Sequence, residues 1–211
     1  MNIDKTDFEK AISLWKEWNE KINVVSRKDI DSLFEHHFMH SLAIAEYLER
    51  TGRLDPSENG LRILDVGCGG GFPGIPLAMV MPWAEFTLCD SIGKKIKVAQ
   101  AVAEGLGLAN VRFVNARAET IPDRFDWIVS RAVTSLDNFY PWVKGKYSRG
   151  ILYLKGGDVV SEISELTRKC GVKPSVVSVW PVSSWLKNDY FEEKFVIEIG
   201  KDYLCPPKSE N

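Results

Sequence analysis

The feature that most constrains this chain is a short apolar run that carries an acidic residue and opens into a glycine-rich turn. Residues 61–66 read Leu-Arg-Ile-Leu-Asp-Val, and residues 67–74 read Gly-Cys-Gly-Gly-Gly-Phe-Pro-Gly. A buried strand, such a turn and then a helix are typical of α/β folds that bind nucleotides. Glycine adopts positive φ angles at no steric cost, and it lets a ligand approach the main chain closely. The segment therefore predicts a nucleotide-like ligand at the end of a strand.

Short apolar runs alternate with longer amphipathic ones between residues 61 and 170, which predicts a parallel sheet covered by helices on both faces. Two further strand-like runs, 176–182 and 194–199, are joined by a loop over 183–190 without room for a helix. We expect them to pair as an antiparallel hairpin at the sheet edge, which completes a mostly parallel seven-stranded sheet. The other strands are expected over 61–66, 85–89, 111–114, 127–130 and 150–154, and helices over 74–81, 93–107, 135–144 and 157–170.

The segment before the sheet reads as helical. Apolar residues recur at near-helical spacing over 4–20 and again over 29–48, and a loop rich in Gly, Asp, Pro and Asn follows over 51–60. We therefore expect a helical extension over 1–56 that packs on a core domain over 57–211.

Composition narrows the class of protein. With 45% hydrophobic and 27% charged residues the chain is that of an ordinary globular protein, which excludes disordered and disulfide-scaffold classes. It has no apolar run long enough for a membrane span and no secretory signal, so we expect a cytoplasmic protein without a membrane partner. The spacing of Cys68, Cys89, Cys170 and Cys205 matches no zinc motif, and four reduced thiols are expected. The oligomeric state is left open, with a monomer favoured.

The net charge of −2 does not indicate a nucleic-acid binder, so a polyanion would need a local basic patch. Candidate patches lie at 27–28, at 94–97 and at 144–155, and each of them could equally be a solvated face.

Two classes of ligand compete for the glycine turn. Gly69, Gly71 and Gly74 satisfy the dinucleotide spacing, and Asp90 ends the next strand, where it would bind ribose hydroxyls. However, the carboxylate of Asp65 could lie near a ligand amine and is poorly placed for a pyrophosphate. An amino-acid-bearing nucleoside, S-adenosylmethionine, fits this pattern better. The residues favour a Rossmann-like class I methyltransferase, and they leave open a nicotinamide or flavin enzyme and a non-catalytic nucleotide module.

Several segments carry a more specific pattern than a glycine turn. They are LDVGCGGGFPGIPL over 64–77, DSIGKK over 90–95, AE over 118–119, SRAV over 130–133, LKG over 154–156, WNEKIN over 18–23 and HFMHSL over 37–42. Together they closely resemble the bacterial RsmG (GidB) family, whose members methylate N7 of one guanosine in small-subunit ribosomal RNA. One departure is His40, where many members carry an aspartate.

The resemblance implies roles for individual residues. Gly67 and Phe72 would line the methionine and adenosine side of the cofactor, with Asp90 and Ser91 on the ribose. Ala118 and Glu119 would border the adenine, and Arg131 would bind at the carboxyl edge of the fourth strand. With the two turn residues argued above, the expected set for S-adenosylmethionine is Asp65, Gly67, Gly69, Phe72, Asp90, Ser91, Ala118, Glu119 and Arg131.

The implied partner is 16S ribosomal RNA or a small-subunit particle. Guanine N7 carries a lone pair and no proton, so we nominate no general base and expect positioning to dominate catalysis. Arg131 and Lys155 are expected to hold phosphate or guanine O6, and Lys94 and Lys95 to contact RNA. Candidate stacking partners for the base are Phe72, Trp127, Phe139, Tyr140 and Trp142.

Three clustered histidines invite a metal interpretation, because His36 and His40 fall one helical turn apart. No acidic third ligand follows at a recognised spacing, so we expect no metal site. His36, His37 and His40 are expected to face solvent or the seam between the leading helices and the sheet.

Overall fold

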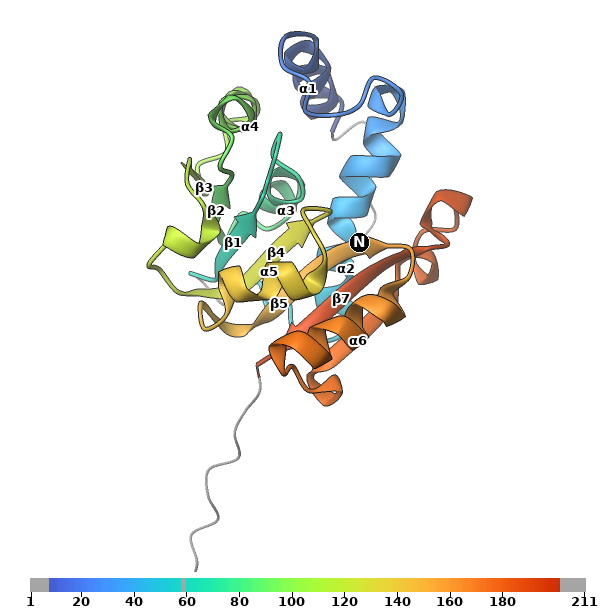
Figure 1. The fold of residues 1–211 in the computed structure, drawn as a ribbon. Helices are drawn as coiled ribbons and strands as arrows, with labels where there is room; N and C mark the ends of the chain where they lie inside the picture. The colour runs from blue at the N-terminus through green and yellow to red at the C-terminus, as the bar shows by residue number, and fades with distance from the viewer. Residues whose placement is uncertain (1–7, 58–59, 202–211) are drawn as a thin grey trace, which may run out of the picture.

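The computed structural model describes residues 8–57 and 60–201. These residues form a seven-stranded sheet with the strand order β3-β2-β1-β4-β5-β7-β6 (Figure 1). Its strands are β1 (Arg62–Val66), β2 (Glu85–Cys89), β3 (Val111–Val114), β4 (Phe125–Arg131), β5 (Tyr147–Gly156), β6 (Val177–Pro181) and β7 (Lys194–Gly200).

Strands β1 to β5 run parallel to one another, as the alternation of strands and helices requires. Strand β7 pairs antiparallel with both β5 and β6, so the expected terminal hairpin is confirmed. The later strand of the hairpin, β7, lies inside the sheet, and β6 forms the edge. The loop between them holds two short 3-10 turns, η6 (Val182–Ser184) and η7 (Asp189–Phe191).

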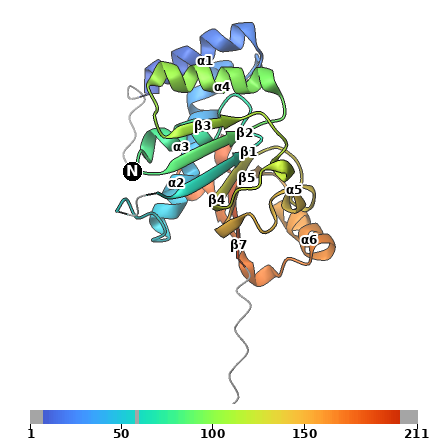
Figure 2. The ribbon, with the colours of Figure 1, turned by 90° about the vertical axis from the view of Figure 1, so that its left-hand side faces the viewer.

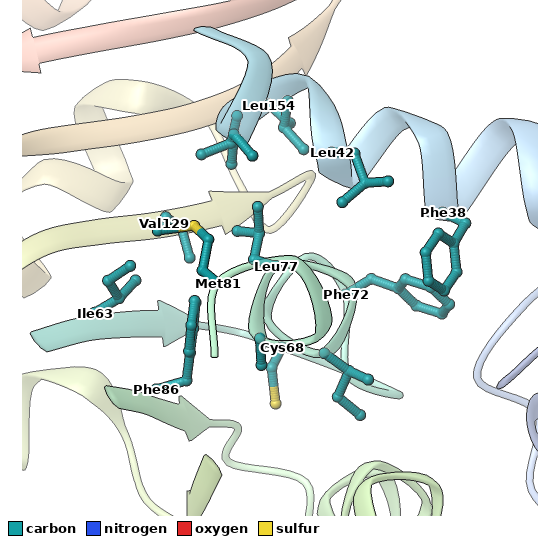
Figure 3. Packing of buried hydrophobic residues seen from close by; sticks show 14 of the residues in the cluster. Phe38, Leu42, Ile63, Cys68, Phe72, Leu77, Met81, Phe86, Val129 and Leu154 are labelled. Atoms are coloured by element: carbon teal, nitrogen blue, oxygen red, sulfur yellow. The ribbon is translucent and has the colours of Figure 1, made fainter. Parts of the chain in front are cut away.

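Helices cover both faces of the sheet, and each face has its own apolar cluster. Along β1, Ile63 packs into one cluster while Leu64 and Val66 pack into the other, because side chains of a strand alternate between faces. Figure 3 shows the larger cluster, in which Phe38 and Phe72 lie together. The helices are α1 (Glu9–Lys21), α2 (His40–Arg50), α3 (Gly74–Val80) and α4 (Gly93–Leu106) on one face, and α5 (Leu136–Val143) and α6 (Val159–Cys170) on the other.

The leading helices share their core with the sheet. Helix α1 lies along α4 (Figure 2), and its Trp15 is fully buried in the larger cluster. The leading helices and the sheet thus contribute side chains to one apolar cluster. The domain boundary expected near residue 56 stays a prediction.

The expected helix over 29–48 is not a single α-helix. A 3-10 turn, η2 (Ile30–Ser32), and a π-helical stretch, η3 (Leu33–Met39), precede α2. A π-helix has wider turns than an α-helix, so the faces of its side chains depart from the 3.6-residue repeat. His36 and His37 belong to this π-helical stretch, and His40 begins α2.

Among the described residues, no helix is long and apolar enough to cross a membrane. Cys68, Cys89 and Cys170 are free thiols, as expected, and burial raises the pKa of the first two. Cys205 lies outside the described residues.

Candidate functional site

A crevice of about 840 Å³ opens at the carboxyl ends of β1, β2 and β4. The strand order reverses between β1 and β4, and ligands of open α/β sheets bind at such a switch point. The crevice is lined by the turns after these strands, by the leading segment and by residues near β7.

The glycine turn forms the floor of this crevice. Gly67 and Gly69 have φ angles of +69° and +55°, which other residues rarely adopt. A Cβ on Gly67 would lie 2.4 Å from Val133, whereas a Cβ on Gly69 would meet nothing within 4 Å. The turn is held from the other side by Cys89, whose carbonyl oxygen accepts from the main-chain N–H groups of Gly67 and Cys68 at 2.8 and 3.0 Å. Gly69 therefore presents bare main chain to open space.

Asp90 joins two walls of the crevice. Its buried carboxylate accepts from the N–H of Gly69 at 2.9 Å and from the N–H of Ile92 at 2.8 Å. These bonds fix the glycine turn against the turn after β2. Asp90 lines the crevice. Its contact with a ribose stays a prediction.

Asp65 does not belong to the lining of the crevice. It is fully buried, and its Oδ2 accepts from the N–H of Gly74, the first residue of α3, at 2.8 Å. Burial raises the pKa of this carboxyl group to about 8. The structure thus gives Asp65 a contact within the fold at the start of α3, and its contact with a ligand amine stays a prediction.

Three more residues predicted to bind the cofactor, Ser91, Ala118 and Glu119, lie in the walls of the crevice. Ser91 follows β2, and the turn η4 (Ala118–Thr120) brings Ala118 and Glu119 to the wall after β3. Two apolar side chains at the crevice, Ile92 and Val133, are 42% and 37% exposed. They give the crevice part of its apolar surface.

Arg131, the last residue of β4, lines the crevice and does not form a surface ion pair. Its guanidinium lies 5.1 Å from the ring centroid of Phe72 and donates to the carbonyl oxygen of His36 at 3.2 Å and to Nδ1 of His37 at 2.7 Å. Burial lowers the pKa of Arg131 to about 10, which leaves it charged at neutral pH. The next residue, Ala132, has a φ of +51°, a strained conformation of the kind that gathers at binding sites.

Of the predicted lysines, Lys95 and Lys155 line the crevice, and Lys94 is an exposed residue outside its lining. Lys155 already has two partners, because its Nζ lies 2.9 Å from the carbonyl oxygen of Thr134 and 2.8 Å from the carboxylate of Glu162.

The five predicted stacking residues separate into two groups. Phe72 and Trp142 line the crevice, and Trp127 and Phe139 are core residues with 2% and 0% exposure. Tyr140 packs against the smaller apolar cluster. Phe72 has its ring stacked on Trp15, with 4.4 Å between centroids, so it is held by the fold.

A family model described as rRNA small subunit methyltransferase G, GidB, matches residues 4–186. The chain belongs to the GidB family. The Ribosomal RNA small subunit methyltransferase G of Cytophaga hutchinsonii is 49% identical over 191 residues, which cover 87% of this chain and 83% of that protein. The protein of the same name from Flavobacterium psychrophilum is 45% identical over 206 residues, which cover 94% and 91%.

The fold of this GidB-family chain also resembles solved structures. Magnesium protoporphyrin IX methyltransferase (ChlM) from Synechocystis PCC 6803 with bound SAM matches with a TM-score of 0.63 at 16% identity, covering 95% of this chain and 98% of that one. This likeness shows the class I methyltransferase fold, and it confirms the fold class expected from the order of strands and helices.

Sequence reasoning about the GidB site missed one wall of the crevice. This wall consists of Val24, His37 and His40 from the leading segment, with Tyr190 and Lys194 from the other end of the chain. The available signal in the sequence was that residues 37–42 resemble the corresponding segment of the family, and this resemblance does not tell which residues of the crevice they contact.

The histidines lie in the seam between the leading segment and the sheet, as one of the two expectations had it. His36 stacks on Tyr190 with ring centroids 3.6 Å apart, and His40 is buried. Burial, followed by the charge of Arg131, holds the pKa of His40 well below its usual value. Among the described residues, no group of three His, Cys, Asp or Glu side chains is arranged to hold a metal ion.

Proposed function

We propose that this protein transfers a methyl group from S-adenosylmethionine to N7 of a guanosine in 16S ribosomal RNA, in the cytoplasm. The observation that carries the proposal is the crevice at the switch point of a GidB-family chain, with the open main chain of Gly69 at its floor. The relatives named above are small-subunit ribosomal RNA methyltransferases, which supports the same substrate here.

The residues of the crevice fit S-adenosylmethionine. The open space above Gly69 admits a ligand against the main chain, and the carboxylate of Asp90 beside it suits ribose hydroxyls. The exposed side chain of Ile92, after β2, offers apolar surface to an adenine ring. The charged group of Arg131 offers a partner to the carboxylate of the methionine portion.

When bound, S-adenosylmethionine supplies a methyl group on a positively charged sulfur. Guanine N7 attacks with a lone pair and has no proton to lose, so the chain needs to supply position and not a general base. Holding reacting atoms in line at near-attack distance contributes roughly 7 to 11 kcal/mol. With Arg131 directed to the cofactor, the cationic side chain of Lys95 at the crevice is suited to phosphate or to the acceptor O6 of guanine.

Calorimetry with S-adenosylhomocysteine and with NADH tests the ligand class. We expect micromolar binding of S-adenosylhomocysteine and no binding of NADH, and the reverse result would support an oxidoreductase. Binding without transfer of labelled methyl groups to RNA would support a module that only senses the cofactor.

The substrate is tested by supplying labelled S-adenosylmethionine with naked 16S ribosomal RNA or with small-subunit particles. Mass mapping should locate one N7-methylguanosine in the product and should find it absent from ribosomes of a strain that lacks this protein. Label at another base, or none with either substrate, would contradict the proposed substrate.

A further inference from the structure

A chain of hydrogen bonds runs from the leading segment to the crevice. The carboxylate of Asp29 contacts two histidine rings. Its Oδ1 lies 2.5 Å from Nδ1 of His36, and its Oδ2 lies 2.5 Å from Nε2 of His37. The other ring nitrogen of His37, Nδ1, lies 2.7 Å from a terminal nitrogen of Arg131. His37 therefore stands between a carboxylate and a guanidinium, and both it and Arg131 line the crevice.

The chemistry of these groups fixes the proton of His37. A guanidinium nitrogen only donates, so Nδ1 of His37 accepts, and the proton of the neutral ring is on Nε2 and is donated to Asp29. Burial and then the charge of Arg131 lower the pKa of His37 to about 4, so the ring is neutral at physiological pH. Burial acts to raise the pKa of Asp29, but the hydrogen bonds from His36 and His37 outweigh it and leave that pKa below its usual value. The carboxylate is thus ionised and orients the ring.

Arg131 makes no direct ion pair within the part of the chain that the structure describes. Among residues 8–57 and 60–201, no carboxylate lies within ion-pair distance of its guanidinium, whose two hydrogen-bond partners are the neutral His37 ring and a carbonyl oxygen. Asp65 and Asp29 act on this partly exposed cation through their charge without contacting it, so a ligand carboxylate in the crevice would be its first direct ion-pair partner. Arg131 lies beside the glycine turn, because Ser130 pairs with Val66 and the next residues along the two strands are Arg131 and Gly67.

We propose that His37, oriented by Asp29, is a positioning residue that holds the Arg131 guanidinium toward the carboxylate of the methionine portion of the cofactor. This inference rests on the proposed function. It assigns to the leading segment a part in cofactor binding, through Asp29 and His37.

Two ligands separate this role from a general effect on the fold. S-adenosylhomocysteine carries the carboxylate, and 5′-methylthioadenosine has the same nucleoside without the amino-acid end. For His37→Leu we expect the Kd of S-adenosylhomocysteine to rise about tenfold, since a charge-assisted hydrogen bond is lost, while the Kd of 5′-methylthioadenosine stays within about twofold. A purely structural role would weaken both ligands together.

His37→Asn is the matched control, because its amide oxygen offers an acceptor close to the position of Nδ1. The affinity of His37→Asn for S-adenosylhomocysteine should be close to that of the unaltered protein and well above that of His37→Leu. Asp29→Ala removes a partly exposed side chain and should show the same ligand pattern with a smaller change, which keeps the test informative if His37→Leu unfolds. Thermal unfolding accompanies each variant.

An unchanged Kd for S-adenosylhomocysteine in both His37→Leu and Asp29→Ala, or an equal loss with both ligands, would overturn the inference. So would weaker RNA binding with intact cofactor binding. If the unaltered protein binds neither nucleoside, the proposed function itself fails, and this result is distinct from the others.

Discussion

The indole Nε1 of Trp15 donates a hydrogen bond of 2.7 Å to the carbonyl oxygen of Gly70, and both groups are buried. The same indole stacks on Phe72. Helix α1 therefore touches the glycine turn at two points, so its packing and the shape of the crevice floor are coupled.

Replacing Trp15 with Phe should destabilise the protein by at least about 1–3 kcal/mol, because the buried carbonyl group of Gly70 loses its donor and the smaller ring leaves a gap in the core. Urea denaturation measures the free energy of unfolding. Trp18→Phe on the same helix is the control, since Trp18 is partly exposed and packs at the edge of the cluster. Equal losses in the two variants would show that the hydrogen bond to Gly70 contributes little.

Gly69→Val should weaken S-adenosylhomocysteine binding at least tenfold, because its side chain would project from the floor into the open crevice. Gly52→Val is a matched control. Gly52 also has a positive φ, +66°, and open space around its missing Cβ, but it lies in the turn after α2 and away from the crevice. Both variants should lose stability from backbone strain, and only the first should lose affinity in calorimetry. A similar affinity in the two would contradict a ligand above Gly69.

Lys94→Glu should weaken RNA binding and lower the slope of log affinity against log salt by about one, while leaving the affinity for S-adenosylhomocysteine unchanged. Lys94 is the better choice than Lys95, because Lys95 lines the crevice. Lys201→Glu serves as control. Lys201 follows β7, whose last residue, Gly200, pairs with Gly150 near the start of β5, so Lys201 lies at the end of the sheet away from the carboxyl ends of the parallel strands. If both variants bind RNA alike across a salt series, Lys94 belongs to a solvated face.

Asp65 should make stability fall as pH rises. Burial raises its pKa to about 8 in the folded protein, whereas the unfolded carboxyl group has its ordinary value of 3.8. Between these values the folded state holds a proton that the unfolded state has released, so the free energy of unfolding decreases with pH through this window. Asp65→Asn removes the titration and keeps an acceptor for the N–H of Gly74.

Urea denaturation of both proteins at pH 5, 6, 7 and 8 isolates this effect, because all other groups titrate in both. The decrease should be larger in the unaltered protein than in Asp65→Asn. Parallel curves would mean that Asp65 is ionised in the folded state at neutral pH.

The sheet was largely predictable from sequence because short apolar runs are bracketed by turns. The bounds expected for β2 and β3 agree with the structure, and the helix expected over 93–107 begins at Gly93 and ends before Gly107, which takes the left-handed conformation at its C-terminus. The hairpin was also predictable, since 183–190 is too short for a crossover helix.

The leading segment was less predictable. Apolar periodicity predicts the 3.6-residue repeat of an α-helix, whereas residues 33–39 form a π-helix, which has wider turns. Within this stretch the adjacent residues His36 and His37 contact the same carboxylate, that of Asp29. Likewise, Asp65 at a strand end was expected to reach a ligand. Only the structure shows that its carboxyl group accepts from the N–H of Gly74, the first residue of α3.

The crevice draws its walls from both extremes of the described chain, with Val24 and His37 on one side and Tyr190 and Lys194 on the other. A nascent chain that has not yet extended past residue 194 therefore has the glycine turn but lacks an enclosing surface around it. A variant truncated before Tyr190 should therefore retain the nucleoside more weakly, although the glycine turn itself is still present in that chain.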